Sequence, residues 1–170
     1  MSDMLVRLYD LPDHGELVKR LQREGVELRR VLPPEKQVVL DWVRRNFEFG
    51  GWPNECEKAM LNTPVSCYIA VEKNQIVGFA CHDATCRNLF GPCGVSAACR
   101  GRGIGKALLW VALRAMAEQG YAYAIIAWVS SVEFYAKAVN ATVIEGSKPG
   151  LFRGMLPIPN NTTCTSQQGR

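Results

Sequence analysis

The chain has 170 residues, of which 48% are hydrophobic and 21% charged, the usual balance for one compact domain with a sizeable core. Its net charge of +4 is small and its basic residues are scattered, which argues against a nucleic-acid partner. No apolar run approaches the roughly 18 residues of a membrane-spanning helix, and the N-terminus lacks a basic region followed by an apolar one, so we expect a cytoplasmic protein with no membrane partner.

The first half of the chain alternates apolar runs with amphipathic segments. Helical spacing of apolar residues predicts helices, and short β-rich runs predict strands. The expected order is strand, helix, strand, long helix, short helix and two strands, over residues 5–9, 13–24, 26–32, 33–49, 54–61, 65–71 and 75–84. The last two runs are joined by only three residues, which favours an antiparallel hairpin.

The second half contains the most regular helix, over residues 104–119. It follows a strand over 89–95 that Gly91, Pro92 and Gly94 interrupt, a pattern that favours a bulge or a close approach by another group. The remaining expected elements are a strand, a helix and two final strands, over residues 121–129, 132–139, 141–144 and 151–156. Residues 157–170 are polar, and we expect them to form a disordered tail.

A glycine-rich basic string, Arg-Gly-Arg-Gly-Ile-Gly-Lys, occupies residues 100–106, just before the strongest helix. Its glycines can turn several backbone N–H groups toward one point, and the helix N-terminus adds the positive end of its dipole. The side chains of Arg100, Arg102 and Lys106 add charge. The string therefore predicts a phosphate-binding site.

Spacing excludes two of the three phosphate loops that could explain this string. A dinucleotide-binding Gly-x-Gly-x-x-Gly would need glycine where Lys106 or Leu108 stands. A nucleoside-triphosphate loop would need glycine in place of Arg100 and Ser or Thr in place of Ala107.

The third, the pyrophosphate loop of the GCN5-related N-acetyltransferase (GNAT) family, matches at Arg100, Gly103 and Gly105. Residues 91–95 also resemble the family's bulged fourth strand, and Phe-Tyr-Ala-Lys at 134–137 resembles the motif of its last helix. The resemblance covers residues 26–156 and leaves residues 1–25 as an N-terminal extension, which would pack on the sheet edge or support a homodimer. It implies an α/β (α+β) GNAT fold, with helices flanking a mixed, mostly antiparallel sheet that is splayed between its fourth and fifth strands.

The resemblance implies acetyl-CoA as co-substrate, with its pantetheine arm in the splayed gap and its pyrophosphate on the loop. Tyr135 matches the family's proton donor to the departing thiolate; a tyrosine in the core is the alternative. Ser130 or Ser131 stands where many members carry a cofactor-binding asparagine. The residues expected to bind the cofactor are Cys93, Gly94, Val95, Arg100, Gly101, Arg102, Gly103, Ile104, Gly105, Lys106, Ser130 and Tyr135.

Acetyl transfer needs a neutral amine, and an alkylamine with a pKa near 10.4 is protonated at neutral pH, so a base or a water relay is required. Glu57 and Asp83 are the candidates for this base, with Glu55 and His82 beside them. Each could equally be a surface or paired residue. Trp52 either lines the acceptor pocket or packs in the core.

We therefore expect an acyl-CoA-dependent N-acyltransferase that acetylates a primary amine of a small molecule. The alternatives are a catalytically silent acetyl-CoA-binding regulatory module and an enzyme that acetylates lysines or N-termini of proteins. Seven cysteines without a Cys-x-x-Cys pair are interpreted as reduced residues, mostly in apolar segments, so no metal site is expected.

Overall fold

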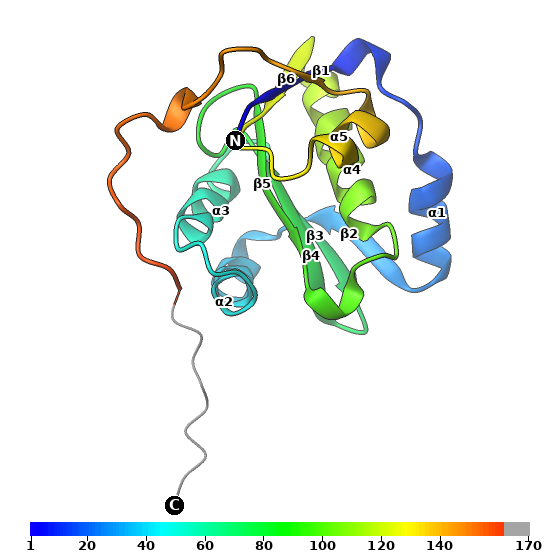
Figure 1. Ribbon diagram of the computed structural model, residues 1–170. Helices are drawn as coiled ribbons and strands as arrows, with labels where there is room; N and C mark the ends of the chain where they lie inside the picture. Colours follow the sequence, from blue (N-terminus) through cyan, green and yellow to red (C-terminus); the bar gives the residue numbers. More distant parts are fainter. Residues whose placement is uncertain (162–170) are drawn as a thin grey trace, which may run out of the picture.

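A computed structural model describes residues 1–161, which form a seven-stranded sheet with helices on both faces (Figure 1). The strands lie in the order β2-β3-β4-β5-β6-β1-β7, and all neighbours are antiparallel except β5 and β6. The strands are β1 (Met4–Arg7), β2 (Val26–Arg30), β3 (Cys67–Glu72), β4 (Gln75–His82), β5 (Leu89–Val95), β6 (Tyr123–Ile126) and β7 (Thr142–Val143). The predicted mixed, mostly antiparallel α/β fold is confirmed.

The helices divide between the two faces of the sheet, and each group covers its own apolar core (Figure 1). They are α1 (Gly15–Arg23), α2 (Lys36–Asn46), α3 (Trp52–Met60), α4 (Ile104–Glu118) and α5 (Val132–Val139). On one face α4 buries Leu108 and Leu113 completely and is joined by α1 and α5. On the other face α2 and α3 pack over Ile69 and Phe79. No helix within residues 1–161 has the length and apolar character needed to cross a membrane.

The sheet opens between β5 and β6, the strands that correspond to the fourth and fifth strands of the expected fold, since β1 precedes that core. These parallel strands pair only at their beginning, where Leu89 lies opposite Ile125 and Phe90 opposite Ile126. Beyond Phe90 the two strands separate, because β5 continues along β4 for five more residues while β6 ends at Ile126. The predicted splay is therefore present.

Residues 1–25 contribute to the interior of the sheet. β1 lies between β6 and β7 and pairs with both, and its side chains Met4 and Val6 are fully buried. Helix α1 follows and packs beside α4, where its Leu21 is also fully buried. Residues 1–25, which were expected to be an extension of the family fold, thus share an apolar core with α4.

The predicted strand over 151–156 is wrong, because the chain forms a 3₁₀ turn at Gly150–Phe152 instead. Gly150 and Gly154 adopt positive φ angles of 72° and 77°, which a strand does not accommodate. The segment then runs past α3 toward α2 (Figure 1). Of the tail expected to be disordered, residues 157–161 are described, and the backbone N–H of Asn161 donates to the carbonyl of Glu48. Residues 162–170 lie outside the described part of the chain.

Candidate active site

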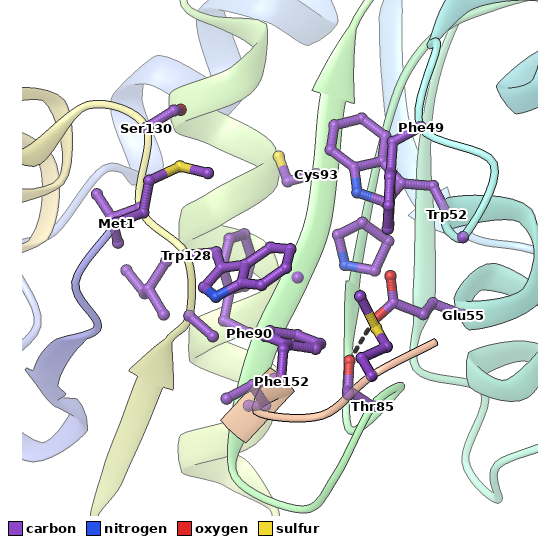
Figure 2. Close-up of a pocket in the computed structure, with 18 of the residues that line it drawn as sticks. Met1, Phe49, Trp52, Glu55, Thr85, Phe90, Cys93, Trp128, Ser130 and Phe152 are labelled. Atoms are coloured by element: carbon purple, nitrogen blue, oxygen red, sulfur yellow. Dashed lines mark hydrogen bonds between the residues drawn. The ribbon is translucent and has the colours of Figure 1, made fainter. Parts of the chain in front are cut away.

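A cavity of about 600 Å³ lies where the sheet is splayed. Its walls come from α3 and the connection before it, the first part of β5, the β6–α5 connection, α5 and the C-terminal segment (Figure 2). Aromatic and aliphatic side chains dominate the lining. A cavity of this size is typical of a small-molecule site in a protein.

One edge of β5 presents free backbone groups to the gap. The N–H of Ser96 donates to the carbonyl of Val77 at 2.9 Å, and Gly94 lies opposite Phe79 two residues earlier in the same register. In an antiparallel ladder successive residues direct their N–H and C=O groups to opposite sides. Cys93 and Val95 therefore direct theirs away from β4, toward the gap, whereas Gly94, the third residue of this strand expected to bind the cofactor, directs its own toward β4.

The glycine-rich loop approaches α4 through two left-handed glycines, Gly101 at φ 80° and Gly103 at φ 89°. These angles bring the chain sharply into the first turn of α4, whose initial N–H groups have no partner within the helix. Helix α1 supports the loop, since Arg20 Nη2 donates to the carbonyl of Arg102 at 2.9 Å. Leu17 lies close enough that a Cβ on Gly103 would stand 3.0 Å from its Cδ1 atom.

The side chain of Arg102 is paired within the protein. Its two terminal nitrogens donate to the two carboxylate oxygens of Glu72 on β3, at 3.0 and 2.8 Å. This bidentate pair raises the pKa of Arg102 and lowers that of Glu72. Arg102 thus fixes the loop on the sheet, while Arg100 is exposed and Lys106 half-buried in the same loop. Arg100 also donates from Nε to the carbonyl of Val95 at 3.3 Å.

Tyr135 lines the cavity together with Cys93 and Ser130. Helix α5 is positioned by its N-cap, where the Ser131 hydroxyl accepts a hydrogen bond from the N–H of Phe134. Burial, with a smaller effect of the nearby Cys93, raises the pKa of Tyr135 above its ordinary value of 10. Burial also raises the pKa of Cys93 to about 12. Both groups therefore carry their protons at neutral pH.

Glu55 brings a carboxylate into the cavity, where it accepts a hydrogen bond from the hydroxyl of Thr85 (Figure 2). Burial raises the pKa of Glu55 above its usual value, although the bond from Thr85 opposes the shift. Trp52 lines the same cavity. Residues three apart share one face of a helix, so Trp52 and Glu55 could have been placed together from helical phase alone.

Of the four candidate bases named from the sequence, Glu55 lines this cavity, while Glu57 and Asp83 do not. Glu57 lies two residues after Glu55 and turns to another side of α3, where its carboxylate pairs with Lys36 Nζ at 2.9 Å. Asp83 accepts the backbone N–H of Asn88 at 2.7 Å and lies 3.1 Å from Nδ1 of His82. Their contacts are those of paired residues outside the cavity.

Four aromatic residues of the cavity were not anticipated: Phe49, Phe90, Trp128 and Phe152. Trp128 and Phe152 contact one another with ring centroids 4.4 Å apart, and Trp128 adopts a left-handed φ of 49°. Such a conformation is unusual for a bulky residue and is held here by neighbouring structure. No periodic signal marks these residues, since they come from connections, from a strand end and from the segment mistaken for a strand.

Three buried cysteines, Cys56, Cys67 and Cys81, lie together between α3 and the sheet with their sulfur atoms within 4.8 Å of one another. They are surrounded by apolar residues of the α2–α3 core, as expected for small core residues. Cys86, by contrast, is exposed.

Comparison with known proteins gives one family and several similar structures. The sequence model of the acetyltransferase (GNAT) family matches residues 36–140. Among curated proteins, no relative of this sequence was found. A GCN5-related glucosamine N-acetyltransferase region of a fungal multi-domain β-N-acetylglucosaminidase has a TM-score of 0.68 at 17% identity, over 84% of this chain and 19% of that one.

Two bacterial structures are also similar. A GCN5-related N-acetyltransferase from Sphaerobacter thermophilus has a TM-score of 0.62 at 22% identity, over 84% of this chain and 48% of that one. A GNAT family acetyltransferase from Brucella melitensis, in complex with acetyl-CoA, has a TM-score of 0.53 at 14% identity, over 70% of this chain and 86% of that one. The chain thus spans about a fifth of the fungal protein and about half of the Sphaerobacter one, and these low identities show a shared fold.

Proposed function

The chain belongs to the acetyltransferase (GNAT) family, and we propose that it transfers an acetyl group from acetyl-CoA to a primary amine of a small molecule. The observation that carries the proposal is the edge of β5 that no strand pairs beyond Phe90, where Cys93 lines a cavity that also contains Tyr135 and Glu55. Backbone donors, a phenol and a carboxylate thus lie at one cavity.

The residues present fit acetyl-CoA at both of its polar parts. The outward N–H groups of Cys93 and Val95 and the C=O group of Cys93 suit an extended amide chain such as pantetheine, while Arg100 occupies the C=O group of Val95. The turn at Gly101 and Gly103 and the first N–H groups of α4 suit a pyrophosphate, with Arg100 as a nearby cation. When bound, acetyl-CoA supplies the thioester whose carbonyl carbon the amine attacks.

Glu55 is the acceptor-side base in this proposal. An ammonium of pKa near 10.4 must lose a proton before it can act as a nucleophile, and Glu55 takes that proton directly or through a water. Its raised pKa makes it a better proton acceptor than an exposed carboxylate. As the C–N bond forms and the C–S bond breaks, Tyr135 donates its proton to the departing sulfur, and the proton that the new amide nitrogen loses restores the phenol. Overall, one ammonium and one thioester give one amide, one thiol and one proton.

The C-terminal segment favours a small acceptor over a protein. Phe152, Met155 and Ile158 line the cavity, and Asn161 Nδ2 donates to the carbonyl of Phe47 at 2.8 Å, beyond the far wall. A Cβ on Gly50 would stand 2.1 Å from the carbonyl oxygen of Pro159, so the segment lies directly on the α2–α3 connection. This strap, residues 150–161, forms one wall of the cavity and so leaves less room for a polypeptide acceptor.

Calorimetric titration of the full chain with acetyl-CoA tests the proposal, with Gly105→Glu and Gly105→Ala as a matched pair. A Cβ at Gly105 makes only ordinary contact with Val95, whereas a Cβ at Gly103 would also press on α1. We expect binding by the wild type and Gly105→Ala and none by Gly105→Glu, whose carboxylate repels pyrophosphate. Failure of the folded wild type to bind acetyl-CoA would contradict the proposal. Binding without any amine-dependent release of CoA would instead indicate a silent module.

A further inference from the structure

We infer that the acceptor is an aromatic monoamine, in which one primary amino group is joined by a short stem to an aromatic ring; this inference rests on the proposed function. The cavity that contains Cys93 and Tyr135 is also lined by the aromatic rings of Phe49, Trp52, Phe90, Trp128 and Phe152, which form its aromatic end. Figure 2 shows these rings on both sides of the space into which Glu55 projects.

Charge in the cavity matches a single ammonium group. Among the described residues that line it, Glu55 has the one carboxyl side chain, and none is a lysine, an arginine or a histidine. A carboxylate pairs with an ammonium, and the faces of Trp and Phe rings attract the same cation. A second ammonium, as in a polyamine, would have no acidic partner here and would lie unpaired against aromatic rings.

Polarity of the walls excludes acceptors that carry many hydroxyl groups. Apart from Glu55, and from Ser130 and Tyr135 on the side of the thioester, the polar side chains of the lining are Asn54 and Thr85, and the Thr85 hydroxyl already donates to Glu55. A sugar would leave most of its hydroxyls without hydrogen-bond partners, which costs affinity for each one. An aromatic ring instead loses its contact with water and packs against ring faces and edges.

The rings are held in place, so the aromatic end exists before any ligand binds. Trp52 is braced from behind by Phe47 at 4.9 Å and Phe79 at 5.8 Å between ring centroids. On the opposite side, Trp128 Nε1 donates to the carbonyl of Pro149, and the Trp128 ring contacts Phe152. Preorganised aromatic walls reduce the entropy lost on binding a rigid ring.

The test compares four acceptors with the full chain and acetyl-CoA: 2-phenylethylamine, spermidine, glucosamine and a short peptide with one lysine. We expect kcat/KM for 2-phenylethylamine to exceed that of each other amine at least tenfold. Calorimetry in the presence of CoA should also show 2-phenylethylamine binding more tightly than the others. If acetyl-CoA binds but another amine is preferred, or none is bound or acetylated, the inference is wrong although cofactor binding stands. If acetyl-CoA does not bind, the proposed function itself fails.

Two variants of the strap separate ligand contact from folding. Phe152→Ala removes a ring that lines the cavity, while Leu151→Ala removes the neighbouring side chain, which is half exposed and outside the cavity. We expect Phe152→Ala to raise KM for 2-phenylethylamine by about five- to tenfold and to leave KM for acetyl-CoA unchanged. Leu151→Ala should change neither. Equal KM values for 2-phenylethylamine in the two variants would contradict the assignment of Phe152 to the acceptor end.

Discussion

Replacement of Tyr135 by Phe removes the proposed proton donor and keeps its ring. The ordinary pKa of tyrosine is about 10 and that of a thiol about 8.5, so proton transfer from phenol to thiolate in water is uphill by roughly 2 kcal/mol. Burial raises the pKa of Tyr135 further, which alone would make it a weak donor. A weak donor contributes little to the rate.

The buried environment of the leaving group brings the pKa of the departing thiol closer to that of Tyr135. Cys93 is a thiol that lines the same cavity, and burial raises its pKa to about 12. A CoA thiolate formed beside it would be destabilised in the same way, so its proton affinity rises toward that of Tyr135. General acid catalysis then contributes about 10²- to 10³-fold, within the range measured for positioned donors.

The assay is steady-state release of CoA from acetyl-CoA, with an accepted amine, from about pH 6.5 to 9.5. We expect Tyr135→Phe to lower kcat by about 10²- to 10³-fold across this range, since the raised pKa keeps the wild-type phenol protonated throughout. Calorimetry should find the affinity for acetyl-CoA unchanged. A variant that keeps kcat within threefold of the wild type would refute the reasoning and leave Tyr135 as a packing residue.

Three further variants test other parts of the argument. Glu55→Gln should lower kcat/KM most near neutral pH. Because burial raises the pKa of Glu55, its ionisation destabilises the wild type. The Tm of the variant should therefore equal that of the wild type at acidic pH and exceed it increasingly as the pH rises through that pKa. Met4→Ala should lower the free energy of unfolding by about 2–5 kcal/mol in urea titrations, against about 0.5 kcal/mol or less for the exposed control Val38→Ala. Glu72→Gln should weaken acetyl-CoA binding in calorimetry by freeing Arg102. Because Arg102 lowers the pKa of Glu72, the ionised Glu72 stabilises the wild type. The Tm of Glu72→Gln should therefore lie below that of the wild type at neutral pH, and this difference should shrink as the pH falls through that pKa.

The backbone geometry of the proposed cofactor site could be predicted from the sequence because short-range rules determine it. Positive φ at Gly101 and Gly103, the start of α4 at Ile104 and the irregular strand β5 all follow from local residue types. The N-cap at Ser131 is equally local. In such segments the backbone groups themselves bind the ligand, so residue types that determine the backbone conformation also determine the binding groups.

The acceptor side could not be predicted in this way, because it assembles segments far apart in the chain. Phe49, Phe90 and Phe152 meet only after the sheet forms and the C-terminal segment crosses it. Strand β1 enters between β6 and β7, a pairing that no local pattern specifies. Helical phase, in contrast, could have shown that Glu55 shares the face of Trp52 and that Glu57 does not.

The N-terminal segment links the two halves of the site. Asp3, 8% exposed, accepts the backbone N–H of Trp128 at 3.1 Å and thereby supports the left-handed turn that presents this ring to the acceptor end. Its own N–H donates to Ser147 Oγ at 2.9 Å, at the start of the path to the strap. Further along, Arg20 holds the carbonyl of Arg102 in the phosphate loop. One short segment thus contacts both the wall proposed for the acceptor and the loop proposed for the cofactor.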